Sequence, residues 1–186
     1  MNVKACGRLT LRPLNGHWYR ALRLRFWRTR LSTDHARSSA SRFTFANPHA
    51  PGPRILYLGE HAQVVLYEVG ALLGDPGGPV SNPGSSWLIL GLHVILDMVA
   101  DLSDATQLRL LRTSHQELTG VWQAGSDPSP TQRLGAALFE RPGLEAFLYP
   151  SARPPGKNLV VFPDKLGERS LIMFDNEMNG RYERLH

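Results

Sequence analysis

The chain has 186 residues, 42% of them hydrophobic, which is enough to bury one core and too short to favour two domains. Its single cysteine, Cys6, excludes an internal disulfide framework and a thiolate metal site, which fits a reducing compartment. The net charge of +5 is concentrated in residues 1–42, which hold ten Lys or Arg residues and one acid. We therefore expect one domain over residues 1–186, with a basic N-terminal segment at 1–42 and a core at about 18–175.

The first expected element is the basic run WYRALRLRF at residues 18–26. Its alternation predicts a strand whose Leu22, Leu24 and Phe26 face the core while the arginines face water or a ligand. The longer run from 20 to 30 also suits nucleic-acid binding, because arginines contact phosphates and aromatic rings stack on bases. A third interpretation is that some of these arginines bind the pyrophosphate of a small ligand.

The remaining pattern contains more strands than helices. Strands are expected at residues 54–59, 87–96, 147–151, 158–163 and 170–175, and helices at 61–73, around 104–111 and at 130–141. Because regular helical crossovers are missing from the second half, the pattern predicts an α+β domain with a mixed, largely antiparallel sheet. The Pro- and Gly-rich stretches ANPHAPGP, GDPGGPVSNPGSS and ARPPGKN are typical of loops, either lids over a ligand or plain surface excursions.

Targeting signals and the common catalytic motifs are not found in the sequence. The longest apolar run, at residues 87–96, is about half the length of a membrane span, and the start of the chain has no signal-peptide core. No Walker loop, dinucleotide fingerprint, nucleophile elbow or zinc-protease motif is present. We expect a cytoplasmic protein without a membrane contact and without a metal site.

One glutamate interrupts an apolar run, ILYLGEHAQVVLYEVGALL at residues 55–73. In a helix, Val64, Val65, Ala71 and Leu72 would share a face with Glu68. Removing a carboxylate from water without a partner costs several kcal/mol, so a compensating cation, hydroxyl or ligand is expected.

Two further residues accompany this glutamate in our candidate site. Arg42 lies in SRFTF, which predicts that it opens a strand, and Tyr57 lies in the next expected strand. One interpretation is catalytic. The other is structural, in which Arg42 and Glu68 form a buried ion pair and Tyr57 is a core aromatic residue with a bonded hydroxyl.

The order of SRF, ILYLGE, LYEVG and YPSARPPGKNLVVFP along residues 18–163 resembles the RES domain family, whose members are toxins of bacterial toxin–antitoxin pairs. In this resemblance the family's arginine falls on Arg42, its tyrosine on Tyr57, its glutamate on Glu68 and its serine on Ser151. The family's spacing of eleven residues from the tyrosine to the glutamate is kept. The connection that precedes the tyrosine is longer than the family's usual one.

The resemblance implies a fold related to the ADP-ribosyltransferase toxins and an activity that consumes NAD+. Glu68 would stabilise positive charge on the ribose as the nicotinamide leaves. Arg42 would bind the pyrophosphate or the ribose, and Tyr57 would stack on the nicotinamide. Ser151 would donate a hydrogen bond to the nicotinamide ribose or position the nucleophile.

Two earlier residues belong to the same set of expectations. Tyr19 and Arg20 match the family's early W/Y-R element and are expected to line the same pocket, although a structural role explains them equally well.

The leading prediction is a toxin of a type II toxin–antitoxin pair that cleaves the nicotinamide–ribose bond of NAD+ as a glycohydrolase or phosphorylase and arrests growth by NAD+ depletion. One alternative is a mono-ADP-ribosyltransferase that modifies a specific cellular protein. Another is a non-catalytic nucleic-acid-binding protein. In the leading prediction NAD+ is the substrate, no metal takes part, a cognate antitoxin occludes the active site, and nucleic acid is contacted only through that antitoxin.

Overall fold

The computed structural model describes residues 1–45, 51–75, 77–82, 86–123, 127–153, 156–176 and 181–185. Parts of the three Pro- and Gly-rich stretches, at residues 46–50, 76, 83–85 and 154–155, lie outside these described residues. In the described part of the chain, no helix has the length and apolar character needed to cross a bilayer.

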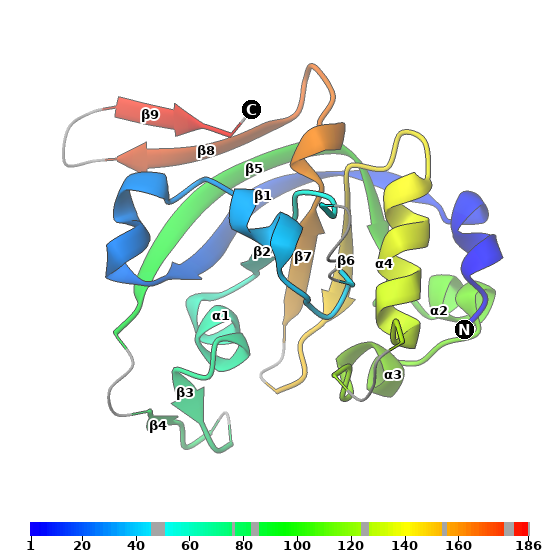
Figure 1. The fold of residues 1–186 in the computed structure, drawn as a ribbon, viewed down its shortest axis with the longest axis horizontal. Coiled ribbons are helices and arrows are strands. Elements are labelled where there is room, and N and C mark those ends of the chain that lie inside the picture. The colour runs from blue at the N-terminus through cyan, green and yellow to red at the C-terminus, as the bar shows by residue number, and fades with distance from the viewer. Residues whose placement is uncertain are drawn as a thin grey trace.

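Seven strands form one curved sheet in the order β1-β2-β7-β6-β5-β8-β9 (Figure 1). Their bounds are β1 Leu11–Leu22, β2 Leu56–Gly59, β5 Leu88–Asp101, β6 Ala146–Pro150, β7 Lys157–Val161, β8 Leu171–Asn176 and β9 Arg181–Arg184. Strands β1 and β5 also pair with each other along almost their whole length, so β1, β2, β7, β6 and β5 close into a ring. Only the β5–β6 pairing in this sheet is parallel among the described strands, which confirms the predicted mixed, largely antiparallel sheet.

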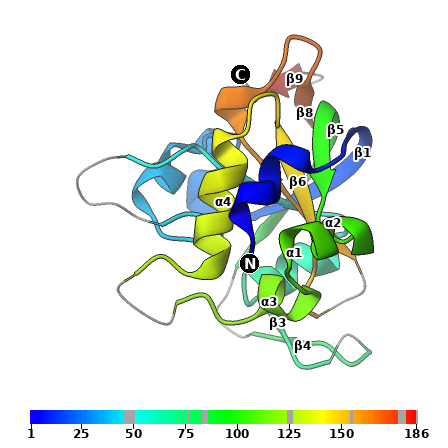
Figure 2. The ribbon, with the colours of Figure 1, turned by 90° about the vertical axis from the view of Figure 1, so that its right-hand side faces the viewer.

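The helices are short. They are α1 Ala62–Glu68, α2 Ala105–Leu111, α3 His115–Thr119 and α4 Pro130–Glu140, with 3₁₀ turns η1 Val3–Arg8, η2 Leu24–Thr29, η3 Asp34–Ser38 and η4 Pro163–Lys165. Helices α2, α3 and α4 each begin at a capping side chain. Asp104 caps α2, and Ser129 forms a capping box with Gln132 ahead of Pro130 at the start of α4. Helix α4 packs beside η1 (Figure 2), and a small hairpin of β3 Leu72–Leu73 and β4 Val80–Ser81 follows α1.

Helix α1 is shorter than the predicted helix over residues 61–73. It ends at Glu68 because Gly70 takes a φ of 68°, in the left-handed region that favours glycine. The N–H of Ala71 then bonds to the carbonyl of Leu66 at 2.8 Å, which closes the helix end. Glu68 is therefore a helix-terminal residue that borders open space.

The first strand also differs from its prediction, which covered residues 18–26. Strand β1 ends at Leu22, which pairs with Leu88, the first residue of β5. Beyond that point no described strand pairs with the chain, which turns into η2. Leu24 and Phe26, expected in the core, are 66% and 47% exposed. The local alternation was a poor guide here because strand length is set by the partner strand.

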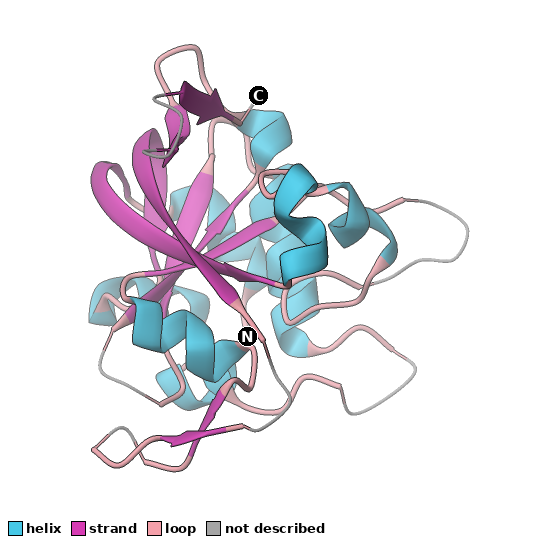
Figure 3. Cartoon of the chain, turned by 90° about the vertical axis from the view of Figure 1, so that its left-hand side faces the viewer, coloured by secondary structure: helices cyan, strands magenta, loops and turns pink. Residues whose placement is uncertain are grey.

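Alternate side chains of the sheet enter two separate cores. Leu56, Leu58 and Leu159 belong to one core, whereas Val160 and Phe147 belong to the other, which lies beneath α4. Figure 3 shows the curved sheet with helices gathered beside it. Tyr57 points to the helix-side core, so the period of two along β2 places its ring between the sheet and the helices, where the candidate site lies.

Candidate active site

A cavity of about 360 Å³ opens between the sheet, α1 and the segment that follows α3. Its lining brings together four of the six residues that the sequence singled out, namely Arg20, Arg42, Tyr57 and Glu68. These four residues come from β1, a turn, β2 and α1. Other lining side chains come from β6, β7 and the loop after α3.

Glu68 is exposed and lies at the edge of this cavity. Its Oε1 accepts a hydrogen bond of 2.9 Å from Nδ2 of Asn158, a residue of β7 that is 2% exposed. Among the described residues no cation forms an ion pair with Glu68, so the alternative of a buried pair with Arg42 is wrong. Among the described residues the group bonded to Glu68 is an amide, not the cation or hydroxyl that we expected.

Close packing between β2 and α1 positions this glutamate. A Cβ atom on Gly59 would lie 2.7 Å from Val65 Cγ1 and 2.9 Å from Val64 Cγ1, so only glycine permits this approach. The end of β2 and the first turns of α1 therefore form one rigid unit.

Arg42 lies in a tight turn and does not open a strand as predicted. Ser41 and Thr44 form an isolated bridge, with Arg42 and Phe43 between them. Nη1 of Arg42 donates to the carbonyls of Leu118 at 3.1 Å and Gly120 at 2.6 Å. Two of the five guanidinium donors are used in this way, while the donors on Nε and Nη2 have no acceptor among the described residues.

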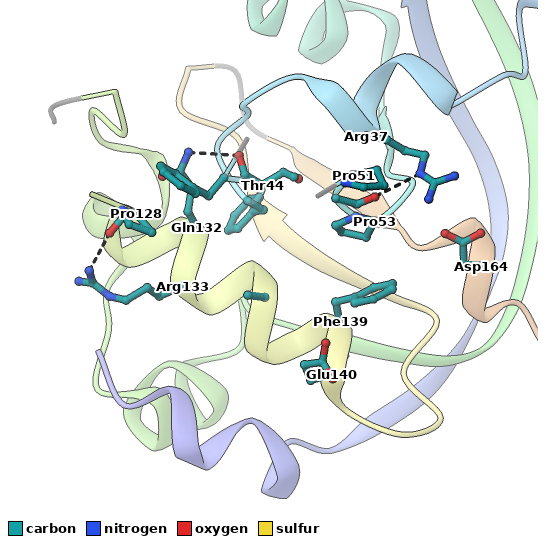
Figure 4. A pocket seen from close by; sticks show the side chains of 14 residues that line it. Arg37, Thr44, Pro51, Pro53, Pro128, Gln132, Arg133, Phe139, Glu140 and Asp164 are labelled. Carbon is teal, nitrogen blue, oxygen red and sulfur yellow. Dashed lines mark hydrogen bonds between the residues drawn. The ribbon is translucent and has the colours of Figure 1, made fainter. Parts of the chain in front are cut away.

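Helix α4 holds the turn that carries Arg42 (Figure 4). Nε2 of Gln132 donates to the carbonyl of Ser41 at 3.0 Å and to that of Thr44 at 3.2 Å, while its Oε1 accepts from the N–H of Ser129. A Cβ on Gly135 would lie 2.0 Å from the Phe43 carbonyl oxygen, so the helix and the turn touch through backbone atoms.

Arg20 is a second cation at the cavity. Its guanidinium donates to the carbonyls of Arg30 at 2.6 Å and Ser32 at 3.1 Å, and no described carboxylate forms an ion pair with it. Burial lowers its pKa to about 10, so it remains charged at neutral pH. An enclosed guanidinium bonded only to neutral carbonyls is a suitable partner for an anionic ligand.

Two tyrosine hydroxyls line the cavity. Tyr57 exchanges a hydrogen bond of 2.7 Å with Ser41 Oγ, and burial raises its pKa, so the phenol stays protonated at neutral pH. Burial also raises the pKa of Tyr149 well above 10, with smaller contributions from the charge of Glu68 and from Tyr57. Both hydroxyls are therefore neutral hydrogen-bond donors.

Several cavity residues were missed in the sequence. Tyr149 shares a strand face with Ser151, two positions later, and this period of two was the available signal. Asn158 carried no local signal, since its partner Glu68 is 90 positions away. His35 lines the cavity with its pKa lowered by burial and by the nearby charge of Arg20, and Trp122 lines it from the loop after α3.

Two predicted residues are outside the cavity lining. Tyr19 is half-buried in β1, opposite Gly59 and Gly91. Ser151 follows β6, and its N–H bonds to the carbonyl of Gly156 at 3.0 Å. Its Oγ is buried without a hydrogen-bond partner among the described residues.

A larger groove of about 590 Å³ lies on the other side of the turn, between residues 51–53 and α4 (Figure 4). Arg37, Phe139 and Asp164 line it, and none of the six predicted residues does. We place the candidate site in the smaller cavity because cations, carboxylate and phenols converge there. The described residues contain no group of three or more His, Cys, Asp or Glu side chains able to hold a metal ion.

Comparisons with known proteins bear on the family and the fold. The sequence model of the RES domain family matches residues 17–178. Among solved structures, a chain from the crystal structure of the M. tuberculosis MbcT-MbcA toxin-antitoxin complex superposes with a TM-score of 0.62 at 16% sequence identity. The alignment covers 99% of this chain and 88% of that chain, a likeness that establishes a shared fold. No curated protein matches the sequence.

Proposed function

The chain belongs to the RES domain family, and from this premise we propose that it is a toxin that cleaves the nicotinamide–ribose bond of NAD+ at the cavity of Glu68. The observation that carries the proposal is the opposition of one carboxylate to two guanidinium groups in a single cavity. Arg20 and Arg42 lack carboxylate partners among the described residues, and Glu68 lacks a cation. A ligand with a pyrophosphate and a cationic end satisfies both sides at once.

The chemistry follows from these charges. In NAD+ the nicotinamide nitrogen is bonded to C1′ of a ribose, and when this bond breaks its electron pair goes to the nitrogen, which leaves as neutral nicotinamide. Positive charge then develops on the ribose ring, as in glycoside hydrolysis. The carboxylate of Glu68 stabilises that charge, and Asn158 orients the carboxylate. Water or phosphate completes the reaction by bonding to C1′, and attack by water releases a proton.

The remaining lining residues orient the substrate. The donors on Nε and Nη2 of Arg42 have no acceptor among the described residues and suit phosphate oxygens, and Arg20 adds a second positive charge. Tyr57 presents an aromatic ring beside the cavity for the nicotinamide. Binding therefore expels water from around Glu68, which is exposed in the unliganded protein, and strengthens its interaction with the developing charge.

The fold comparison supports an antitoxin as the physiological partner. The M. tuberculosis structure is that of a toxin–antitoxin complex. We propose that a cognate antitoxin inhibits this chain by covering the cavity, where the guanidinium groups of Arg20 and Arg42 favour an acidic segment. Loss of toxicity on co-expression with the adjacent gene is the expected result, and unchanged toxicity contradicts this pairing.

The test measures NAD+ loss and identifies products by mass spectrometry for wild type and Glu68→Gln under three conditions: without phosphate, with phosphate, and with cell lysate and NAD+ that carries a label on its adenine. Loss of the negative charge is expected to lower kcat by roughly 100- to 1000-fold, the cost of one electrostatic group in a water-excluded site. Leu24→Ala, on the exposed surface of η2, is the matched control. Free ADP-ribose indicates hydrolysis, its phosphate indicates phosphorolysis, and labelled protein in lysate indicates transfer.

The opposite results are equally informative. If wild type leaves NAD+ intact under all three conditions, or if Glu68→Gln keeps wild-type kcat, the proposed chemistry is wrong. A folded variant is verified by its unfolding midpoint, which should match that of wild type because Glu68 is exposed.

A further inference from the structure

A second cavity, of about 390 Å³, adjoins the candidate site. It is lined by residues 119–123 together with Arg42. Two of these residues, Arg42 and Trp122, also line the 360 Å³ cavity that contains Glu68. The two cavities therefore meet at one guanidinium and one indole.

Trp122 is half-buried where the two cavities adjoin. No described aromatic ring, cation or hydrogen-bond acceptor contacts it, whereas Trp27 has Phe174 and Arg30, and Trp87 has Arg23. An aromatic ring held between two cavities presents a free face for stacking.

The backbone just before the ring is anchored. Gly120 donates its N–H to the carbonyl of Gln116 at 2.8 Å and accepts the 2.6 Å bond from Nη1 of Arg42. The same bond thus fixes both the guanidinium and the start of the segment that carries Trp122. The position of Trp122 near Arg42 therefore depends on this contact between the Arg42 turn and the end of α3.

We propose that Trp122 is the stacking platform for the adenine of NAD+, with the pyrophosphate crossing Arg42 from one cavity to the other. This inference rests on the proposed function and extends it. A dinucleotide has two nucleosides joined by a pyrophosphate, and the Glu68 cavity takes the nicotinamide nucleoside. The second nucleoside must therefore lie beyond the phosphates, and the cavity that shares Arg42 is the adjoining space.

The chemistry of the second cavity fits a purine. Stacking on an indole depends on the flat ring of the base and tolerates different substituents. Gln123, which also lines this cavity, supplies an amide with both donors and an acceptor for the edge of the base. Three donors of Arg42, on Nε and Nη2, have no acceptor in the described part of the chain and suit phosphate oxygens at the junction.

The experiment compares two substrates that share the same scissile bond. NAD+ carries an adenylate group, and nicotinamide mononucleotide lacks it, that is, the adenosine together with one of the two phosphates. Steady-state kinetics are measured for wild type, Trp122→Ala, Trp122→Phe and the control Leu24→Ala. Trp122→Ala is expected to raise KM for NAD+ about 10-fold, the usual cost of losing one stacked base, and to raise KM for the mononucleotide by a smaller factor, because the mononucleotide has no adenine to stack on Trp122. Trp122→Phe keeps a stacking face and should stay closer to wild type.

An equal change of KM for both substrates, or no change for NAD+, overturns the proposal. A second measurement separates this failure from failure of the proposed function. If wild type consumes neither substrate, titration with AMP followed by calorimetry still tests the subsite. Binding that Trp122→Ala abolishes and Leu24→Ala retains supports a purine subsite in a protein without NAD+ cleavage. Absence of AMP binding to wild type, or binding unaffected by Trp122→Ala, contradicts it.

Discussion

The carboxylate of Glu145 is 3% exposed and accepts hydrogen bonds from four described donors, whereas that of Glu68 is exposed and accepts one. The donors to Glu145 are the N–H groups of Asp97, Met98 and Gly167 and the hydroxyl of Ser170. These bonds join the middle of β5 to the chain before β8, a structural connection with no capacity left for a ligand. A carboxylate with unused acceptor sites at a cavity is, by contrast, available for chemistry.

The surroundings of Glu145 and Glu68 also differ in the hydrogen bonds that stabilise the charged carboxylate. Burial raises the pKa of Glu145, and the four hydrogen bonds outweigh it, so that the pKa lies below its ordinary value. At Glu68 the single bond comes from a neutral amide. We therefore expect substitutions at Glu145 to affect stability and substitutions around Glu68 to affect rate.

The largest expected effect on stability is that of Glu145→Gln. The new NH₂ group faces backbone and hydroxyl donors, so about 3 kcal/mol of unfolding free energy should be lost. Urea unfolding at neutral pH measures it, with Glu68→Gln as the partner variant, expected to stay within about 0.5 kcal/mol of wild type. Equal losses in the two variants would remove the distinction between the two carboxylates.

A smaller effect is expected from Asn158→Ala, which removes the one described donor to Glu68. A freely rotating carboxylate should lower kcat for NAD+ cleavage about 10-fold, equivalent to roughly 1.4 kcal/mol, with KM changed less. Asn158→Asp places a second carboxylate against the first and should be the more damaging of the two. Wild-type kcat in Asn158→Ala would show that the orientation of Glu68 comes from elsewhere.

The smallest expected effect is on the pH dependence of the unfolding free energy. The folded-state pKa of Glu145 is below its unfolded value of about 4.3, so its contribution to stability is complete above that value and is lost as pH falls through the folded-state pKa. Unfolding free energy measured from pH 7 to pH 3 should therefore decline less steeply in Glu145→Gln than in wild type. The pKa of Asp101 is also lowered, so some decline remains in the variant. Parallel pH profiles would contradict the assignment.

The sequence alone allowed good predictions wherever a local pattern had a local cause. The capped start of α4 at Pro130 and its end near Glu140 agree with the prediction to within a residue, since Ser129 and Pro130 act within one turn. The strands β6, β7 and β8 were likewise predicted to within a few residues. The two residues that the sequence places eleven positions apart, Tyr57 and Glu68, both line the cavity, because one strand and one short helix connect them.

Predictions were wrong where the outcome depended on a distant partner. Arg42 lies in a turn held by Gln132, and that clamp spans about 90 positions of sequence. Leu24 and Phe26 alternate like strand residues but are exposed, because β5 offers no partner beyond Leu88. Local sequence patterns for helices and strands cannot predict the turn of Arg42 or the end of β1, because the residues that decide them, Gln132 and Leu88, are far away in the sequence.

The sequence by itself determined the family and the α+β class, because these depend on composition, on periodicity and on motifs kept in order. Only the tertiary structure decided which groups meet. The amide of Asn158 rather than the guanidinium of Arg42 bonds to Glu68, and the carbonyl of Gly120 holds Arg42 beside Trp122. Such contacts follow from the order and register of the strands and from close packing of helix on turn, which are properties of the whole chain.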